Sequence, residues 1–278
     1  MASKRLKYAR FVVYSLCAAS FALLYFHTYS LKIERISLSL PEFEGRFRAV
    51  LISDLHFKRE NRLIKRLAQE TAAAKPDFLF ITGDNIDNLK KWPACRTWLG
   101  KLKKPAMSYF VPGNWEHWSG ALDAGLLGDM ERLGYRVLFN RGEQVKIGTE
   151  RIYIAGIDDV YYGEGDPGKA LKNRPGGVPV ILLSHTPRVM GWLRGKKVNA
   201  VLAGDTHGGQ IRWPWQKRKP VTSINGRFEM GYYRVGDSDL YVTRGVGVSV
   251  FLFRLFCRPE LTIIDFQGRG HKSAKALQ

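Results

Sequence analysis

Seven side chains of this sequence have the chemistry of metal ligands. Each follows a short apolar run, and together they supply three carboxylates, one amide oxygen and three imidazoles: Asp54, His56, Asp84, Asn114, His185, Asp205 and His207. A mixed oxygen and nitrogen donor set without a thiolate suits hard or borderline divalent cations, with manganese or iron(II) ahead of zinc. Because seven donors exceed what one tetrahedral ion takes, the pattern predicts two ions that share a bridging carboxylate.

The apolar runs ahead of the first donors predict a parallel sheet. Strands and helices alternate along the chain, with strands at residues 48–53, 77–82 and 106–111 and helices at residues 61–75, 92–103 and 119–133. Asn61 and Ser119 would cap the first and third helices, and Gly134 would end the third. This alternation is typical of parallel strands with crossover connections, and ligands gather at the carboxyl ends of such strands.

From Gly134 onward the pattern changes. Short runs separated by turns at residues 140–142 and 148–150 predict antiparallel hairpins. The strands predicted in this half lie at residues 135–138, 144–147, 151–155, 178–183, 199–202, 232–235, 240–243 and 261–265. The tail after Gly268 is expected to be disordered.

An apolar segment near the N-terminus predicts a membrane anchor. Residues 11–31 contain no Asp, Glu, Lys or Arg, and a helix of that length reaches about 30 Å, the thickness of a bilayer core. No small-residue cleavage site follows, so a removed signal peptide is disfavoured, and a buried core helix is the alternative. We expect a single-pass anchor in a bacterial inner membrane. Basic residues flank both ends, so the sequence leaves open the side on which the domain lies.

The net charge of the chain is strongly positive. The charge is +19, of which residues 1–40 contribute +5 and the remainder +14. Such a field favours an anionic partner, which could be nucleic acid, an anionic membrane or a phosphorylated substrate. No zinc finger, helix-turn-helix or RNA-binding motif accompanies the charge, so we do not expect nucleic acid to be the partner. The oligomeric state is left open.

At this point the donors resemble a known family, the calcineurin-like metallophosphoesterases. The five blocks of that family occur here in order as Asp54-Leu55-His56, Gly83-Asp84, Gly113-Asn114, His185 and Gly204-Asp205-Thr206-His207. The resemblance implies an α/β fold, a four-layer sandwich of two mixed β-sheets flanked by helices, preceded here by the transmembrane helix. It also implies a division into an N-terminal basic segment and anchor (1–40), a catalytic domain (41–268) and a tail (269–278).

The resemblance also assigns donors to ions. Asp54, His56, Asp84 and His207 would hold one metal, and Asp84 would bridge to a second held by Asn114, His185 and Asp205. Asp205 stands where the family usually has histidine, and a carboxylate there adds negative charge and favours oxygen-loving ions.

A second departure concerns acid catalysis. Trp115 stands where the family has a histidine that assists at the phosphate, and tryptophan cannot donate a proton in that sense. His117 is a candidate catalytic substitute, with a surface histidine as the alternative, whereas Glu116 is expected to be structural. Since a phosphate leaving group needs less acid assistance than an alkoxide, we expect a pyrophosphate or activated diester to be preferred to alkyl phosphomonoesters.

The residues after the last metal motif resemble the membrane-associated subgroup that includes UDP-2,3-diacylglucosamine hydrolase-type enzymes. The resemblance lies in Thr206-His207-Gly208-Gly209-Gln210 and Arg258-Pro259-Glu260-Leu261-Thr262. It implies a lipid-linked phosphosubstrate such as UDP-2,3-diacylglucosamine, in the route to lipid A. A general cell-envelope phosphatase or phosphodiesterase is the first alternative. A non-catalytic relative and a nucleic-acid-binding protein or nuclease are the others.

Two further segments could choose the substrate. Residues 211–219 mix two tryptophans with four cations, and residues 246–256 are unusually apolar. Each could be core, the second as a buried strand. The alternative is an interfacial lip that touches lipid. Asp158 and Asp159 could orient a ligand histidine, contact substrate or cap a turn.

Overall fold

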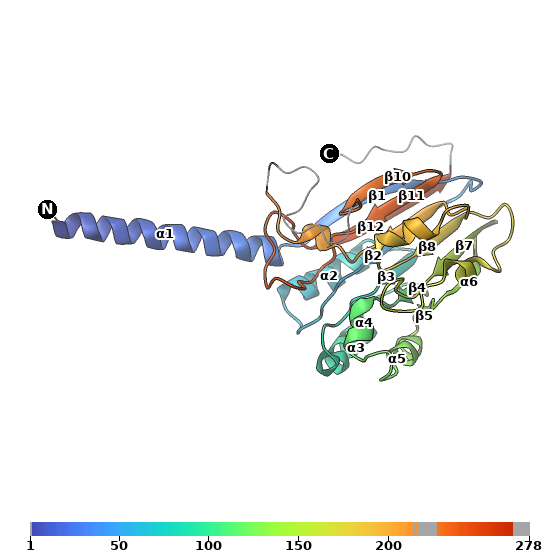
Figure 1. Cartoon of the computed structure of the whole chain (residues 1–278), viewed down its shortest axis with the longest axis horizontal. Helices are drawn as coiled ribbons and strands as arrows, with labels where there is room; N and C mark the ends of the chain where they lie inside the picture. Colours follow the sequence, from blue (N-terminus) through green and yellow to red (C-terminus); the bar gives the residue numbers. More distant parts are fainter. Residues whose placement is uncertain (1, 214, 216–226, 269–278) are drawn as a thin grey trace.

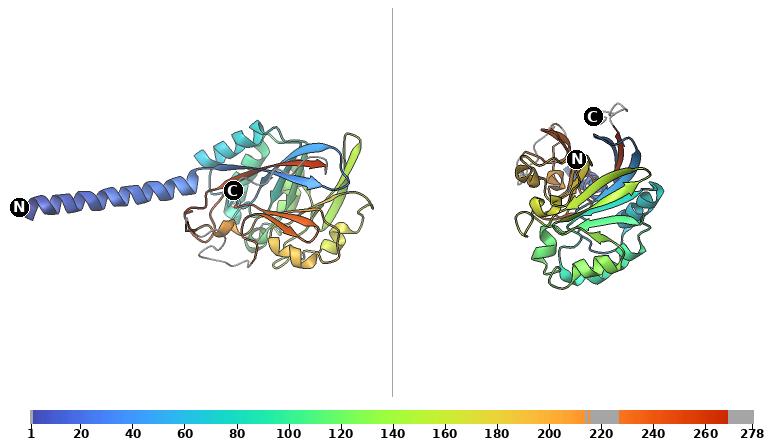
Figure 2. Two further views of the ribbon diagram at one scale, coloured as in Figure 1. Left: turned by 90° about the horizontal axis from the view of Figure 1, so that it is seen from above. Right: turned by 90° about the vertical axis from the view of Figure 1, so that its right-hand side faces the viewer.

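The computed structural model describes residues 2–213, 215 and 227–268. The predicted disorder of the tail and the cationic half of residues 211–219 therefore lie outside the described residues. Helix α1 (Ala2–Tyr29) projects from a domain that contains two sheets (Figures 1 and 2). Its span Lys4–Tyr29 is long and apolar enough to cross a membrane, and none of its most apolar window is buried against the rest of the chain.

Each sheet has six strands of mixed direction. In order across the first sheet the strands are β1 (Lys32–Leu40), β12 (Glu260–Gly268), β2 (Arg46–Ile52), β3 (Phe78–Thr82), β4 (Met107–Val111) and β5 (Arg136–Val137). In the second sheet they are β10 (Gly231–Val235), β11 (Ser238–Val242), β9 (Ala200–Ala203), β8 (Val180–Leu183), β7 (Glu150–Gly156) and β6 (Arg141–Ile147). The strands that precede the donors are parallel to one another within each sheet: β2, β3 and β4 in the first, and β8 and β9 in the second.

Helices cover the outer faces of the two sheets. They are α2 (Arg62–Ala73), α3 (Trp92–Lys101), α4 (Asn114–Trp118), α5 (Leu126–Arg132) and α6 (Pro167–Leu171), with single turns η1 (Leu89–Lys91), η2 (Pro187–Trp192) and η3 (His207–Gly209). One core cluster fills the space between the sheets, where Phe80 of β3 and Leu183 of β8 are fully buried. A second cluster packs α2 and α3 on the first sheet, and a third covers the second sheet. The predicted four-layer α/β sandwich is confirmed.

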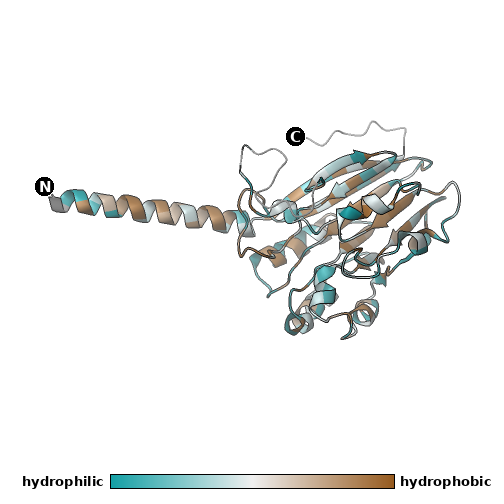
Figure 3. Cartoon of the chain, viewed as in Figure 1, coloured by the Kyte–Doolittle hydropathy of each residue, from teal (hydrophilic) through white to brown (hydrophobic). Residues whose placement is uncertain are grey.

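Many strand segments are coloured as hydrophobic (Figure 3), and the apolar residues of the strands form the core clusters between and outside the sheets. Both faces of β3 and β8 are buried, so these strands consist of continuous apolar residues rather than alternating ones. Asn61 caps α2 as predicted, because its side chain accepts a hydrogen bond from the backbone N–H of Ile64 at 3.0 Å. The first three helix-separated strands therefore lie where the sequence placed them.

Three local predictions differ from the structure. The helix predicted at residues 119–133 is shorter in the structure, where residues 119–125 form turns and only α5 (Leu126–Arg132) is helical. Gly125 has a φ of +86° just ahead of α5, and Ser119 follows the end of α4 instead of capping a start. The predicted hairpin turn at residues 140–142 is wrong, because β5 pairs with β4 in one sheet while β6 pairs with β7 in the other. The turn at residues 148–150 does join an antiparallel pair.

Strand β1 was not predicted, and it changes where the domain begins. It pairs in parallel with β12 over its whole length, from Lys32 beside Glu260 to Leu40 beside Gly268. The predicted boundary placed residues 32–40 with the anchor, whereas the structure places them in the first sheet. The sequence signal that could have revealed the strand is the alternation of apolar and polar residues at Ile36, Leu38 and Leu40, which are the buried positions of β1. Only two residues separate α1 from β1, so α1 joins the domain without a linker.

Candidate metal centre

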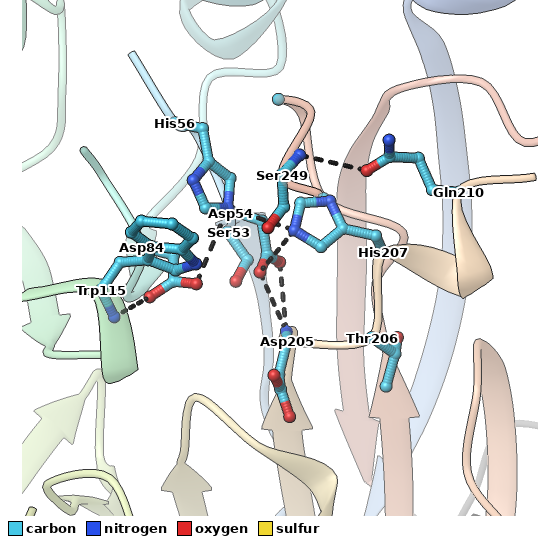
Figure 4. Close-up of polar contacts among 12 residues, drawn as sticks. Ser53, Asp54, His56, Asp84, Trp115, Asp205, Thr206, His207, Gln210 and Ser249 are labelled. Carbon is cyan, nitrogen blue, oxygen red and sulfur yellow. Dashed lines mark hydrogen bonds and ion pairs between the residues drawn. The ribbon is translucent and has the colours of Figure 1, made fainter. Parts of the chain in front are cut away.

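All seven predicted donors lie together where the carboxyl ends of five strands meet. Asp54 and His56 follow β2, Asp84 follows β3 and Asn114 opens α4 after β4. From the second sheet, His185 follows β8, and Asp205 and His207 follow β9. Figure 4 shows the side chains of Asp54, His56, Asp84 and His207 grouped beside one another, with Asp205 below them. Backbone hydrogen bonds join the loops, such as that from Asp54 N–H to the Gly83 carbonyl at 3.1 Å.

One half of the site contains two imidazoles and a carboxylate. The Nε2 atoms of His56 and His207 are 3.1 Å apart, and His207 Nε2 is 3.6 Å from Asp54 Oδ1. One ligand atom from each of these three residues lies within 4.8 Å of the others, and all three residues are buried. The three side chains therefore have the spacing to hold one cation.

The other half contains one imidazole surrounded by oxygens. His185 Nε2 lies 3.2 Å from Asp84 Oδ2, 3.0 Å from Asn114 Oδ1 and 3.9 Å from Asp205 Oδ1. Asp84 Oδ2 is also 3.7 Å from His56 Nε2, so this carboxylate lies between the two halves. Asp54, Asp84 and His185 form a second group with the spacing of a metal site. The geometry thus provides two overlapping sites rather than one.

The Thr82 carbonyl fixes the orientation of His185. The ring nitrogen Nδ1 lies 2.7 Å from that carbonyl oxygen and must donate to it, because a carbonyl only accepts. In the neutral ring the lone pair is then on Nε2, which points into the site. A histidine that donates one N–H to a backbone carbonyl and presents the other nitrogen has the arrangement of a metal ligand.

The charges of the site are perturbed by burial and by each other. Burial raises the pKa of Asp54 and of Asp84, each to about 6, although His185 opposes the rise. Burial lowers the pKa of His56 to about 3 and that of His207 well below its usual value. For His185 burial also lowers the pKa, but the carboxylates led by Asp84 outweigh it and raise the pKa well above its usual value.

This arrangement fits a pair of divalent cations. Within the described residues, the ion pairs of the Asp54 and Asp84 carboxylates are made with histidines alone. Buried carboxylates without a lysine or arginine partner are costly unless a cation neutralises them. Two neutral imidazoles that point their Nε2 atoms at one another likewise leave a lone pair for a metal. The donor set contains oxygen and nitrogen only, as hard and borderline ions prefer.

The backbone at the donors is strained. Ten residues other than glycine have positive φ in the described part of the chain, and five of them are predicted donors: Asp54, His56, Asp84, Asp205 and His207. Such conformations cost about 1–3 kcal/mol each and collect at functional sites. A Cβ on Gly204 would lie 2.0 Å from Ser53 Oγ, so glycine is required for the loops after β2 and β9 to approach.

Glu116 supports the site from beneath and confirms the structural role expected for it. Its buried carboxylate accepts hydrogen bonds from the backbone N–H groups of Asp84 (2.8 Å), Asn85 (2.7 Å) and Gly113 (2.8 Å). The loops that carry Asp84 and Asn114 are thereby joined through one side chain. Burial and Asp84 raise the pKa of Glu116 to about 7.

A cavity of about 410 Å³ opens onto both halves of the site, since His207 of the first half lines it as well as donors of the second. Its lining includes Asp84, Asn114 and Asp205 together with an aromatic wall. The wall consists of Trp115, Trp118, Tyr161 and Tyr162; the Trp118 and Tyr162 rings are 4.6 Å apart. Arg188, which lies 4.8 Å from the Tyr161 ring centre, adds a cation that the sequence analysis missed.

His117 lies beside this cavity but is not among its lining residues. Its Nε2 pairs with Asp158 Oδ1 at 2.7 Å, and Asp158 raises the pKa of His117. Asp158 also accepts the backbone N–H of Glu164, and Asp159 caps a turn by accepting those of Tyr161 and Tyr162. The turn-capping alternative is therefore confirmed for Asp159, while a catalytic role of His117 stays a prediction.

The apolar segment at residues 246–256 is a loop, and the buried-strand alternative is wrong. Gln210 holds this loop: its Nε2 donates to the carbonyls of Phe251 (2.7 Å) and Phe253 (3.0 Å), and its Oε1 accepts the N–H of Ser249 (3.1 Å; Figure 4). Val250 and Leu252 are each 76% exposed. The loop therefore presents apolar side chains to solvent on a fixed backbone.

Arg254 connects this loop to the first half of the site, a role that no sequence pattern indicates. Its fully buried guanidinium donates twice to the Gly247 carbonyl, from Nε at 2.8 Å and Nη2 at 2.6 Å, and once to that of Arg244 at 2.9 Å. Nη2 also lies 3.1 Å from His207 Nδ1, the ring nitrogen that faces away from Asp54. The backbone N–H of Arg254 donates to Thr28 Oγ1 of α1 at 3.0 Å.

The end of α1 is thus docked on the domain beside the site. Arg258 donates from Nε to the Ser30 carbonyl and from Nη2 to the Leu31 carbonyl, both at 3.0 Å. The His27 and Phe256 rings meet edge to face with centres 4.9 Å apart. Together with the Thr28 contact, these bonds fix the direction of α1 relative to the metal centre.

Comparison with known proteins supplies a family description. Residues 47–209 match the family model described as calcineurin-like phosphoesterase. Phosphodiesterase YaeI of Escherichia coli is 28% identical over 224 residues, which cover 79% of this chain and 82% of that protein. The uncharacterized metallophosphoesterase YkuE of Bacillus subtilis is 29% identical, covering 81% and 80%. An uncharacterized metallophosphoesterase of Aquifex aeolicus is 30% identical over 259 residues, covering 88% and 95%.

Proposed function

The chain belongs to the calcineurin-like phosphoesterase family and is a metal-dependent phosphoester hydrolase; we propose that it cleaves a phosphodiester or pyrophosphate bond of a lipid-linked substrate at a membrane surface. The observation that carries the proposal is the convergence of seven donors on one centre: five of them form two overlapping buried groups, and Asn114 and Asp205 lie within 4 Å of His185. We assign Asp54, His56 and His207 to the first ion, Asn114, His185 and Asp205 to the second, and Asp84 to both.

The donor set supports manganese or iron(II) ahead of zinc, since oxygen atoms predominate in the second half. Two divalent ions bound there would supply positive charge to the phosphoryl oxygens and acidify an attacking water. In the hydrolysis itself, the water oxygen forms a bond to phosphorus, the bond from phosphorus to the leaving oxygen breaks, and the water proton leaves to solvent or to the leaving group.

The protein's own residues would orient the substrate in the cavity. Arg188 lies on the cavity wall and would contact a phosphoryl oxygen, as guanidinium groups commonly do. The indoles of Trp115 and Trp118 border the same space, and their rings are 5.2 Å apart. The aromatic wall favours a leaving group with an aromatic or heterocyclic part, such as a nucleotide base.

Two observations support a diester or pyrophosphate over a simple monoester. Trp115 occupies the position of the family's histidine, so the leaving group has no imidazole beside it at that position. One relative bears the name phosphodiesterase. Good leaving groups need little protonation, so their diesters and pyrophosphates would react fastest.

The lipid-linked part of the proposal depends on the anchor. Helix α1 is long and apolar enough to span a membrane and is docked beside the centre, so the domain would stay at the bilayer surface. A substrate like UDP-2,3-diacylglucosamine would satisfy both the aromatic wall and the membrane location. For that nucleotide precursor, the domain would face the cytoplasm of a bacterial inner membrane. A general cell-envelope phosphodiesterase is the second candidate, and the YaeI similarity favours it.

Metal analysis combined with a substrate panel tests the proposal. The full-length protein in detergent should contain about two equivalents of divalent metal. It should hydrolyse bis(p-nitrophenyl) phosphate and UDP-2,3-diacylglucosamine, and a chelator should abolish both reactions. If an alkyl phosphomonoester is hydrolysed faster than both bis(p-nitrophenyl) phosphate and UDP-2,3-diacylglucosamine, the proposed preference for a phosphodiester or pyrophosphate bond is wrong. Activity on the soluble diester without activity on the lipid precursor would favour the second candidate.

A further inference from the structure

A second cavity, of about 710 Å³, lies between the end of α1 and the domain. Leu24 and Tyr25 of α1 form one wall, Val248 and Phe253 of the 246–256 loop form another, and Ile64 of α2 lies on the domain side. We call this space the anchor groove. Its walls are mainly apolar, and Tyr25 is 54% exposed in the absence of a bilayer.

The 246–256 loop separates the anchor groove from the catalytic cavity. Ser249, Val250 and Phe251 line the catalytic cavity, whereas Val248, Leu252 and Phe253 line the anchor groove. Because neighbouring residues of this one loop line the two cavities, the loop is a wall that both cavities share. Gln210 fixes that wall through its three hydrogen bonds to the loop.

The anchor groove also reaches the metal centre. His56, which we assign to the first ion, is among the groove-lining residues although its side chain is buried. On the other side its Nε2 lies 3.1 Å from His207 Nε2 inside the centre. The lining of the groove therefore includes both α1 and a residue that we assign as a metal ligand.

The entrance of the groove is cationic. Lys58, Arg59 and Arg62 are exposed and line the groove, with one acid, Glu60, among them. A row of cations at the end of a membrane-spanning helix would lie at the depth of lipid phosphates, where each contributes about 1 kcal/mol of attraction to anionic lipid. An apolar slot with a cationic entrance at that depth is complementary to an anionic lipid.

We propose that the anchor groove binds an acyl chain of the substrate while the phosphoester occupies the metal centre. The inference rests on the proposed function and adds to it a site for the lipid part. The occupant is the substrate's own chain rather than a bulk bilayer lipid, because the loop that lines the groove also lines the catalytic cavity, so a chain in the groove lies one loop away from the phosphoester. The 246–256 loop would then lie between the chain and the headgroup.

A series of p-nitrophenyl alkyl phosphodiesters tests the groove with one scissile bond and one leaving group. The full-length protein in nanodiscs should cleave the octyl ester with a kcat/KM at least about tenfold above that of the methyl ester, since each fully buried methylene contributes about fourfold. Leu24→Trp and Val248→Trp, which fill the groove from opposite walls, should reduce this ratio by at least about fivefold.

Leu23→Trp is the matched control. Leu23 is the neighbour of Leu24 on α1, is 42% exposed and does not line the groove. Because the alkyl esters partition into the nanodisc equally for every variant, a change confined to Leu24→Trp and Val248→Trp reports the groove. If both of these variants keep the wild-type octyl-to-methyl ratio, the inference is wrong.

Photolabelling gives a readout that does not depend on turnover. A dodecyl phosphodiester with a diazirine at the end of its chain should label residues 57–64 and 248–253 of the full-length protein. Excess unlabelled dodecyl ester should reduce the labelling and the methyl ester should not. Labelling that dodecyl ester does not reduce would identify the occupant as a bilayer lipid and overturn the inference.

The two proposals fail in different ways. If the wild-type protein hydrolyses neither the methyl nor the octyl ester with any added metal, the proposed function fails, whereas competed labelling of the groove would still support the lipid site. If hydrolysis is metal-dependent but chain length and groove variants have no effect, the hydrolase remains and the groove inference fails.

Discussion

The two halves of the metal centre are built by the same device but differ in charge and access. Each half takes its donors from the carboxyl ends of parallel strands. In the first half the side chain of Asp54 is fully buried, and that of His207 is 8% exposed. In the second half the side chain of Asp205 is 22% exposed and borders the catalytic cavity. Donors of both halves therefore border the cavity, and Asp205 is more exposed than His207.

The halves also differ in what supports them. Behind the first half is Arg254, a buried cation that contacts His207 and reaches α1 through Thr28. Around His185 in the second half are the oxygens of Asp84, Asn114 and Asp205. A nitrogen-rich site backed by a cation and an oxygen-rich site surrounded by anions should prefer different ions and hold them with different strength. The predictions below test this contrast.

The largest effect is expected where the halves meet. Asp84→Asn removes the carboxylate that we assign to both ions, and the amide that replaces it carries no charge to neutralise them. We expect kcat/KM for bis(p-nitrophenyl) phosphate to fall by about a thousandfold or more, and the metal content to fall below two equivalents. Asp87→Asn, three residues along and outside the site, is the control. If Asp84→Asn binds two ions and has near-normal activity, Asp84 is not required for metal binding or hydrolysis.

A change behind the first half should act on that half alone. Arg254→Met leaves the Gly247 and Arg244 carbonyls without their donor and removes the contact with His207 Nδ1. We expect affinity for the first metal to fall by about 10- to 100-fold, the usual cost of losing a group that orients a ligand. Titration of the metal-free protein, followed by calorimetry, measures the two affinities separately.

Conservative variants distinguish positioning from general stability. Arg254→Lys keeps the charge but loses the planar fork, and we expect an intermediate loss of affinity. Thr28→Ala removes the acceptor for the Arg254 N–H, whereas Thr28→Ser retains it. If Arg254→Met lowers the melting temperature but leaves both metal affinities unchanged, Arg254 is structural only.

A change in the second half should alter the preference for metal. Asp205→His restores the residue that the family usually has at this position and exchanges an anionic oxygen donor for a neutral nitrogen. We expect the affinity of the second half for zinc relative to manganese to rise by about tenfold, and the first half to keep its preference. Asp205→Asn, which loses charge without gaining nitrogen, is the matched control. An equal change in both halves would show that the ions are not held independently.

The sequence was sufficient for the donors because their signals are local. Asp54 and Asp84 each follow a continuous apolar run, and parallel strands bring such positions to one edge. In the second sheet the donors His185 and Asp205 were predicted in the same way, from the apolar runs that precede them. The four-layer fold was predicted through the family resemblance, whereas residues alone indicated only a parallel sheet followed by shorter strands.

The parts that the sequence did not reveal depend on contacts between distant residues. Arg254 is 47 residues from His207 and 226 from Thr28 along the chain, so no spacing pattern relates them. The anchor groove needs the 246–256 loop, α2 and the end of α1 to meet, which only the docking of α1 produces. The late start of α5 was missed because positive φ at Gly125 outweighed the helical pattern around it.

The smallest expected effect concerns acid assistance beside the second half. Trp115 holds Asp84 through its backbone N–H, 2.9 Å from Oδ1, so a side-chain change leaves that bond in place. Trp115→His would put an imidazole where the family has one. We expect the rate of hydrolysis of an alkyl phosphomonoester to rise by up to about tenfold, because an alkoxide leaving group needs protonation. The rate for p-nitrophenyl diesters should change little, because p-nitrophenolate leaves without protonation. Trp115→Phe controls for loss of the indole. If Trp115→His and Trp115→Phe raise monoester turnover equally, space rather than proton donation limits that reaction, and the substrate preference is set by the aromatic wall.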